Sequence, residues 1–453
     1  MLSDRSRPWW LLGSIVLGML AIGLDVTILN VALPTLAGEL SASTGDLQWF
    51  VASYSLVVVA AILLGGLLGD RYGRRRVLIA ALVLFGVGSV LCAYAGSPEQ
   101  FIAARVVAGL GAAAAIPTSL SVITVTFSDE QRPRAIGIWA AASFLAFPIG
   151  PVLGGWLLSH YWWGSVFLIN VPVILIGIAA LLLLLPESRG PHRPPIDWWG
   201  VATSSTGLTA LTYGFVEAGD KGWDDPVAVV AICLGLVVLT GFVAWERHLG
   251  RRSDGAPLVD MSLFSSRTFT GGTILGALGL FAMIGLLFVA PQYSQAILGA
   301  DAMGSGVRLL PLVGGLMAGA VLADRIAARI GARATVAGGF LVLAVGLAVG
   351  ATTGTDATLG FLAAWTVLVG LGMGPAFATA ASAALGELPH DRAGVGSAVM
   401  QAVQRVGVPL GMAILGSVLS SGYVSRLDLG ALPAAAAQTA RDSVFGALAV
   451  AHS

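Results

Sequence analysis

Residues 66–76 read Gly66-Leu67-Leu68-Gly69-Asp70-Arg71-Tyr72-Gly73-Arg74-Arg75-Arg76 and connect two apolar segments, each long enough to cross a lipid bilayer. Such a short connection, rich in arginine, predicts a tight loop on the cytoplasmic side of a membrane, because short loops rich in Lys and Arg stay inside. Gly73 permits the sharp reversal, since it has no Cβ to clash. This run therefore predicts a membrane protein with several spans and sets its orientation.

The composition agrees with a membrane protein. Of the 453 residues, 57% are hydrophobic and 11% are charged, which would leave a soluble protein with too little polar surface. The net charge is zero, but the basic residues are unevenly placed. Those outside the predicted cytoplasmic loops are Lys221, Arg426 and Arg441 on the external side and Arg105, Arg308 and Arg405 inside spans. We therefore expect the N-terminus in the cytoplasm.

Apolar stretches of roughly 18 or more residues recur along the chain. The expected spans are 9–34, 46–69, 76–96, 99–125, 133–158, 165–185, 197–217, 226–247, 269–298, 303–327, 333–352, 357–385 and 394–421. These are thirteen spans, so the tail after Ser421 is expected outside the cell. Either a fourteenth helix is missing from this chain, or the protein has thirteen spans.

A second charged run looks like a worn copy of the first. Ala320-Val321-Leu322-Ala323-Asp324-Arg325 is followed by Gly331-Ala332-Arg333, which indicates a duplicated unit of six helices. The first run resembles the loop between helices 2 and 3 of the major facilitator superfamily, where an Asp and Arg residues latch the cytoplasmic ends of two parallel-related halves. The matching gating residues here are Gly66, Asp70, Arg71, Gly73 and Arg74.

This resemblance implies an all-α membrane protein with the major facilitator fold. We expect an N-terminal six-helix bundle over residues 1–190, an inserted helix pair over 191–250, a C-terminal bundle with five visible helices over 251–421 and an extracytoplasmic tail over 422–453.

The first span carries an acid within its apolar sequence, Leu24-Asp25-Val26-Thr27-Ile28-Leu29-Asn30-Val31-Ala32-Leu33-Pro34. An ionisable residue is costly inside a membrane, so Asp25 is a functional candidate. The run resembles the helix 1 signature of the fourteen-helix branch of drug:proton antiporters, and this resemblance implies that Asp25 binds and releases a proton. The alternative is a structural pair between Asp25 and a cation.

The candidate partner of Asp25 is Arg105. It begins Arg105-Val106-Val107-Ala108-Gly109-Leu110-Gly111, which resembles the helix 4 motif of the family. At about 1.5 Å of rise per residue, Asp25 lies ~24 Å from the inner start of its span and Arg105 ~9 Å from the outer start of its own. Both then fall in the outer half of a core about 30 Å thick, so contact is possible. The pair predicts a proton switch, in which protonation of Asp25 frees Arg105.

The fifth span predicts the direction of transport. Its sequence Gly150-Pro151-Val152-Leu153-Gly154-Gly155, with Gly137 and Pro148 before it, resembles the signature of antiporters in this superfamily. Glycines let a neighbouring helix approach closely, and prolines bend a helix. Ala146 stands where the family often has another Gly. A contact made here is expected to seal one side of the pathway, and simple packing is the alternative.

Candidate substrate-binding residues lie on five different spans: Asn30, Tyr54, Phe144, Gln292 and Gln401. Two further stretches fit the same branch without a predicted role, Trp49 with Tyr54 and Phe167-Leu168-Ile169-Asn170-Val171-Pro172. No Asp or Glu lies in the interior of the predicted spans after residue 268, away from their ends, and the corresponding stretch of the last span reads Met400-Gln401-Ala402-Val403-Gln404-Arg405. We therefore expect neutral, monocationic or weakly acidic compounds rather than dications.

The sequence predicts proton-coupled export of hydrophobic or amphipathic drugs or antibiotics across a bacterial cytoplasmic membrane by alternating access. Efflux of an amino acid, peptide or siderophore, and a membrane receptor that transports nothing, remain alternatives. No enzyme motif, metal site or disulfide framework is visible, and Cys92 and Cys233 both fall inside predicted spans. We expect no cofactor besides a proton gradient, lipid rather than nucleic acid as the contact of the basic loops, and function as a monomer.

Overall fold

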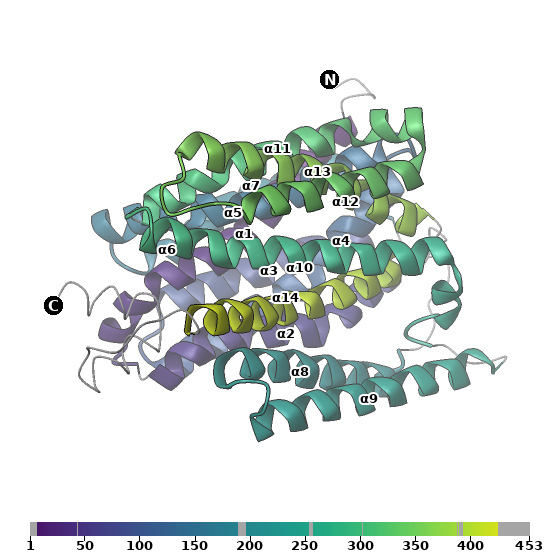
Figure 1. The fold of residues 1–453 in the computed structure, drawn as a ribbon. Helices are drawn as coiled ribbons and strands as arrows, with labels where there is room; N and C mark the ends of the chain where they lie inside the picture. Colours follow the sequence, from purple (N-terminus) through teal and green to yellow (C-terminus); the bar gives the residue numbers. More distant parts are fainter. Residues whose placement is uncertain are drawn as a thin grey trace.

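A computed structural model of the chain describes residues 7–42, 44–188, 196–252, 257–300, 302–386, 388 and 393–424. All regular secondary structure in these ranges is helical, and the helices lie side by side in one bundle (Figure 1). The first set comprises α1 (Arg7–Glu39), α2 (Thr44–Tyr72), α3 (Arg74–Ala93), α4 (Pro98–Thr126), α5 (Arg132–His160), α6 (Ser165–Leu168) and α7 (Asn170–Leu184). The chain continues with α8 (Trp198–Lys221), α9 (Pro226–Gly250), the 3-10 helix η1 (Met261–Ser265), α10 (Arg267–Ala296), α11 (Ala302–Ile330), α12 (Ala332–Gly350), α13 (Leu359–Gly386) and α14 (Ala393–Val424).

The all-α membrane fold is confirmed. Within the described residues, 12 segments are long and apolar enough to span a membrane, with α6 and α7 joined in one segment. Each of the predicted spans corresponds to a helix or, for 165–185, to this α6–α7 segment. Helix α8 is the predicted span that is too polar to be among the 12 segments. Of the predicted tail 422–453, residues 422–424 belong to α14, and the rest lies outside the described residues.

Helix α8 is less apolar because it is covered by protein on several sides. It packs on α9, α2 and α14 (Figure 1), and several of its hydroxyl side chains donate to backbone carbonyls. The Thr203 hydroxyl bonds to the Trp199 carbonyl at 2.8 Å, and the Ser205 hydroxyl bonds to the Ala60 carbonyl of α2 at 2.5 Å. These bonds satisfy polar groups that lipid could not.

The internal repeat suggested by the two charged runs is visible in the helices. Helices α2 and α11 each have 29 residues, and α3 and α12 have 20 and 19. The turn of each pair is a glycine with positive φ, 109° at Gly73 and 84° at Gly331. A side chain at either position would be strained. The same turn therefore closes the corresponding helix pair in each half.

Packing follows the repeat as well. Within the first half α3 packs on α4 and α1 on α5, and within the second half α12 packs on α13 and α10 on α14. Between the halves, α5 packs on α11 and α14 on α2. Helices α11 and α13 meet through facing pairs of glycines four residues apart, Gly315 with Gly319 and Gly370 with Gly374. Small residues at this spacing bring helix backbones into contact inside a membrane.

The predicted span 165–185 is broken near its start. The short α6 ends at Leu168 and α7 begins at Asn170. Pro172 lies in the first turn of α7 and lacks the N–H that would have continued the hydrogen bonds of α6. The break puts Asn170 at the first position of a new helix.

Candidate transport site and gate

Asp25 and Arg105, which are among the most deeply buried charged residues of the described chain, form an ion pair between α1 and α4. A guanidinium nitrogen of Arg105 lies 2.5 Å from a carboxylate oxygen of Asp25, and each side chain is 1% exposed. The two residues come together because their depths in α1 and α4 match, as the positions in the sequence allowed. Burial makes each charge dependent on the other, since an isolated charge is costly in an apolar interior.

Three further residues hold this pair from neighbouring helices. Arg105 Nε donates to the Phe50 carbonyl of α2 at 3.0 Å, and the guanidinium carbon lies 4.3 Å from the centre of the Tyr54 ring. The Asn170 amide donates to Asp25 at 3.4 Å and to the Ser89 hydroxyl of α3 at 3.3 Å. Asn170 and the Phe50 carbonyl were not predicted as site residues. A polar amide inside the predicted apolar span 165–185 was the available signal for Asn170, whereas a backbone carbonyl leaves none.

In this arrangement the positive charge of Arg105 is fixed, whereas a proton can neutralise the negative charge of Asp25. Protonation of Asp25 would cancel the attraction and leave Arg105 with a carbonyl and an aromatic face as its remaining described contacts. These contacts hold a cation less strongly than a carboxylate does. The charge state of Asp25 therefore bears on how firmly α1, α2, α4 and α7 are held together.

A second polar cluster joins the two halves at one end of the bundle. We call this end, which carries the run from Arg71 to Arg76, the arginine end. Asp70 accepts hydrogen bonds from the Gly394 and Val395 backbone N–H groups at 3.0 and 2.8 Å and pairs with Arg74 at 2.8 Å. Gly394 and Val395 lie in the first turn of α14, so Asp70 fills the place of a helix N-cap from another helix.

Close backbone contacts surround this cluster. The backbone of Gly66 lies against that of Gly394, and Gly137 of α5 lies against Ala320 of α11. The Ser397 hydroxyl donates to the Pro117 carbonyl of α4 at 2.9 Å. Among the other predicted loop residues, Arg71 lies 5.5 Å from the Tyr72 ring centre and Gly73 makes the turn into α3. The halves are therefore tightly joined at the arginine end.

The same helices are less covered farther from that end. Ser55 lies about three turns from Gly66 on the same face of α2, and it is exposed. Helix α14 therefore does not cover this level of α2. Asn30 of α1, one of the predicted substrate residues, is exposed too.

The predicted glycines of α5 differ from one another in their surroundings. A Cβ at Gly150 would collide with the Thr27 hydroxyl of α1, and one at Gly154 would lie 3.2 Å from Ile28. The Thr27 hydroxyl also donates to the Ala146 carbonyl at 3.0 Å. Gly155 faces open space. Gly150 and Gly154 therefore serve the contact with α1, and Gly155 does not.

The remaining predicted positions on α5 face the second half or the core. The Pro148 carbonyl lies against Gly306 of α11, and Pro151 is partly buried. Phe144 is buried with its ring centre 6.4 Å from that of Phe147. Of the other predicted substrate residues, Tyr54 belongs to the ion-pair cluster, Gln292 is partly buried and Gln401 is buried on α14.

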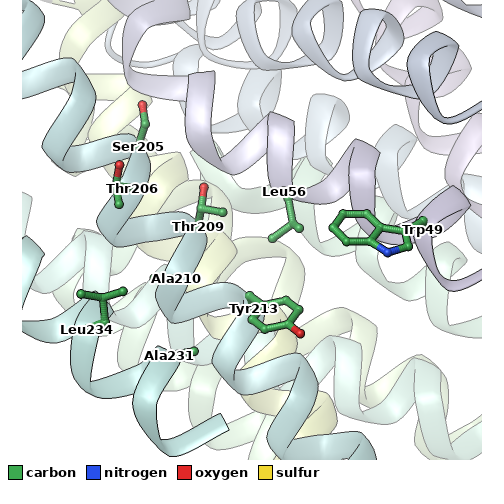
Figure 2. A pocket seen from close by; sticks show the side chains of 9 residues that line it. All are labelled: Trp49, Leu56, Ser205, Thr206, Thr209, Ala210, Tyr213, Ala231 and Leu234. Atoms are coloured by element: carbon green, nitrogen blue, oxygen red, sulfur yellow. The ribbon is translucent and has the colours of Figure 1, made fainter. Parts of the chain in front are cut away.

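A separate apolar groove of about 580 Å³ runs between α2 and the pair α8–α9. Figure 2 shows its lining, with Trp49 and Leu56 from α2 and Tyr213 projecting from α8. The other lining residues are Ser205, Thr206, Thr209, Ala210, Ala231 and Leu234. Trp49, which the sequence matched to the family without a predicted role, is 52% exposed and lines this groove. It therefore lies apart from the ion pair of Asp25 and Arg105.

Two repeated sets of spanning helices, joined at one end through Asp70 and with a buried ion pair elsewhere in the first set, define a membrane transport protein. Residues 15–412 match the Major Facilitator Superfamily, and the chain belongs to this family. The Streptomyces glaucescens tetracenomycin C resistance and export protein is 32% identical over 418 residues, which are 92% of this chain and 77% of that protein. A multidrug efflux pump of Mycolicibacterium smegmatis is 32% identical over 448 residues, covering 98% and 88% of the two chains. These relatives belong to the drug-efflux branch that the sequence motifs predicted.

Solved structures agree on the fold. The proton:xylose symporter XylE matches with a TM-score of 0.64 at 17% identity, covering 99% of this chain and 95% of its own. The human organic anion transporter MFSD10 matches with a TM-score of 0.63 at 16% identity, covering 92% and 94%.

Proposed function

We propose that this transporter exports hydrophobic or amphipathic drugs or antibiotics in exchange for protons. The observation that carries the proposal is the buried pair of Asp25 and Arg105, a group that a proton can discharge at the meeting point of α1, α2, α4 and α7. Its membership of a family whose relatives here are resistance and export proteins supports the substrate class.

Alternating access supplies the mechanism. With the halves joined at the arginine end, a substrate bound between them is shielded from that side, and separation of Asp70 from the start of α14 opens the other state. The arginine-rich loop places this end in the cytoplasm of a bacterial cell, with the N-terminus inside. The described conformation is then closed toward the cytoplasm.

The protein needs no cofactor under this proposal, because the proton gradient supplies the energy. It acts as a monomer, since both halves of the pathway lie in one chain. Membrane lipid fills the exposed groove beside Trp49 and contacts the basic loops.

Purified protein in liposomes tests the proposal. An imposed pH gradient should drive uptake or release of a panel of amphipathic dyes, with protons moving in the opposite direction. Asp25→Asn should abolish gradient-driven transport and still allow dye binding. Transport by this variant at the wild-type rate and with the wild-type dependence on the gradient would remove Asp25 from the coupling.

A further inference from the structure

Helix α14 carries a cation, Arg405, that is partly buried and has no described carboxylate beside it. Arg405 lies about 18 Å from the start of α14, close to the middle of a membrane core of about 30 Å. Within the described residues it forms no ion pair or hydrogen bond, and its Nε is buried without a partner. An unpaired charge at this depth is costly, which marks the position as functional.

A neighbouring amide has the same property. Gln401 is 5% exposed, and its Nε2 has no described hydrogen-bond partner. Residues four apart share a helix face, so Gln401 and Arg405 are neighbours. Gly394 and Ala398 precede them on that face and lie against Gly66 of α2. The two unpartnered donors therefore continue the stripe that α14 turns toward α2.

The charges around this stripe do not balance. The charges of Asp25, Arg105 and Arg405 all act on the Tyr54 phenol. Asp25 and Arg105 neutralise each other, so the Arg405 charge is left over. No carboxylate is among the described groups that influence Arg405. Gln404 does not offset the Arg405 charge, because its amide lies against Gly276 of α10.

We propose that Arg405 and Gln401 bind the anionic oxygen group of an amphipathic substrate, a carboxylate or a phenolate on an aromatic body. Both residues offer N–H donors, and a guanidinium suits a carboxylate in shape as well as charge. The Tyr54 phenol lies within electrostatic reach of Arg405, and its ring offers an aromatic surface. This inference rests on the proposed export function and narrows it to organic anions.

The experiment compares two dyes in liposomes under a proton gradient: fluorescein as the anion and ethidium as the monocation. Wild-type protein should transport fluorescein. Arg405→Gln should lower the fluorescein rate about tenfold, the value of one lost charge-assisted hydrogen bond, and leave ethidium transport, where present, within about a factor of two. Arg405→Lys should recover part of the fluorescein rate, and Gln401→Leu should lower it less than Arg405→Gln.

Arg308→Gln is the matched control. Arg308 also lies in a spanning helix of the second half, but its guanidinium donates to the Ser294 carbonyl at 3.2 Å. This variant should treat both dyes alike. Fluorescein binding to detergent-purified Arg405→Gln, followed by anisotropy beside its thermal unfolding, separates lost binding from lost folding.

Three results would overturn the inference. Equal losses for both dyes in Arg405→Gln would assign Arg405 to structure, and unchanged fluorescein transport would leave it without a role. Wild-type protein that moves ethidium but not fluorescein contradicts the anion site and keeps the export function. Wild-type protein that moves no compound of a wider panel contradicts the export function itself.

Discussion

The pair of Asp25 and Arg105 gives a test that separates stability from coupling. In Asp25→Asn the buried Arg105 loses its counter-charge, and breaking a buried pair from one side costs about 3–5 kcal/mol. The double variant Asp25→Asn with Arg105→Gln removes both charges and should recover most of that loss. Thermal unfolding of purified protein measures the stability, and gradient-driven dye transport measures the coupling.

We expect neither variant to transport against a gradient. A double variant that regains transport together with stability would show that the pair only holds the helices together. If the single variant is as stable as wild type, Arg105 has another charge partner in the Asn form.

The main charges of the site could be predicted from sequence, but their surroundings could not. An acid and an arginine stand out inside apolar spans, and the rise per residue places them at compatible depths. The Phe50 carbonyl and the Asn170 amide complete the site through contacts at 3.0 and 3.4 Å that depend on how α2 and α7 lie against α1 and α4. Such contacts arise only after the helices have packed.

At the scale of a helix, the glycines of α5 provide a matched pair of substitutions. Gly150→Ala places a methyl group against the Thr27 hydroxyl and the backbone of α1, whereas Gly155→Ala enters open space. Overpacking of this kind typically costs about 1–3 kcal/mol. We therefore expect a lower unfolding temperature and proton leakage in Gly150→Ala liposomes, measured with a pH-sensitive dye. Gly155→Ala should match wild type in both, and equal behaviour of the two variants would contradict a specific role for the α1–α5 contact.

The inserted pair offers a similar comparison. A side chain at Gly235 of α9 would press into the backbone of Leu211 in α8, while Gly241 of the same helix has nothing within 4 Å. Gly235→Leu should force α8 and α9 apart and lower stability by about 1–3 kcal/mol. Gly241→Leu should leave stability unchanged. Thermal unfolding of both variants in one detergent decides, and a stable Gly235→Leu protein would mean that the pair tolerates separation.

Helix positions were predictable because apolar length is a strong signal in membranes. The predicted 46–69 and 394–421 correspond to Thr44–Tyr72 and Ala393–Val424. The break between α6 and α7 was missed because Pro172 was taken as an interior residue of one span rather than as part of a first turn. The contrast between Gly150 and Gly155 was also beyond the sequence, since both are small residues in one motif.

At the scale of the whole molecule, the joined halves should separate more readily without Asp70. Ser397 is fully buried at the arginine end, so Ser397→Cys should react slowly with a membrane-impermeant maleimide. Asp70→Ala should increase this rate severalfold, because about 1 kcal/mol of lost capping changes an equilibrium about fivefold. The background needs Cys233→Ser, since Cys233 is exposed, whereas Cys92 is buried. Tyr72→Cys, at an exposed position, is the control.

An unchanged Ser397→Cys rate in Asp70→Ala, with Tyr72→Cys equally reactive in both backgrounds, would show that Asp70 does not hold the halves together. This contact lay beyond sequence reasoning, because Asp70 and Gly394 are 324 positions apart. The charged run predicts that Asp70 meets a helix end, and the folded chain determines which one.

The capping of α14 by Asp70 also makes the secondary structure of one half depend on the position of the other. When the halves part, Gly394 and Val395 lose the acceptor for their N–H groups, and the first turn of α14 has to find water or unwind. In the proposed alternating access, opening would then include local fraying of a helix as well as the rocking of rigid bodies. A substitution that supplies α14 with an acceptor of its own would lower the cost of opening, so the resting preference of the transporter can be tuned far from the pair of Asp25 and Arg105.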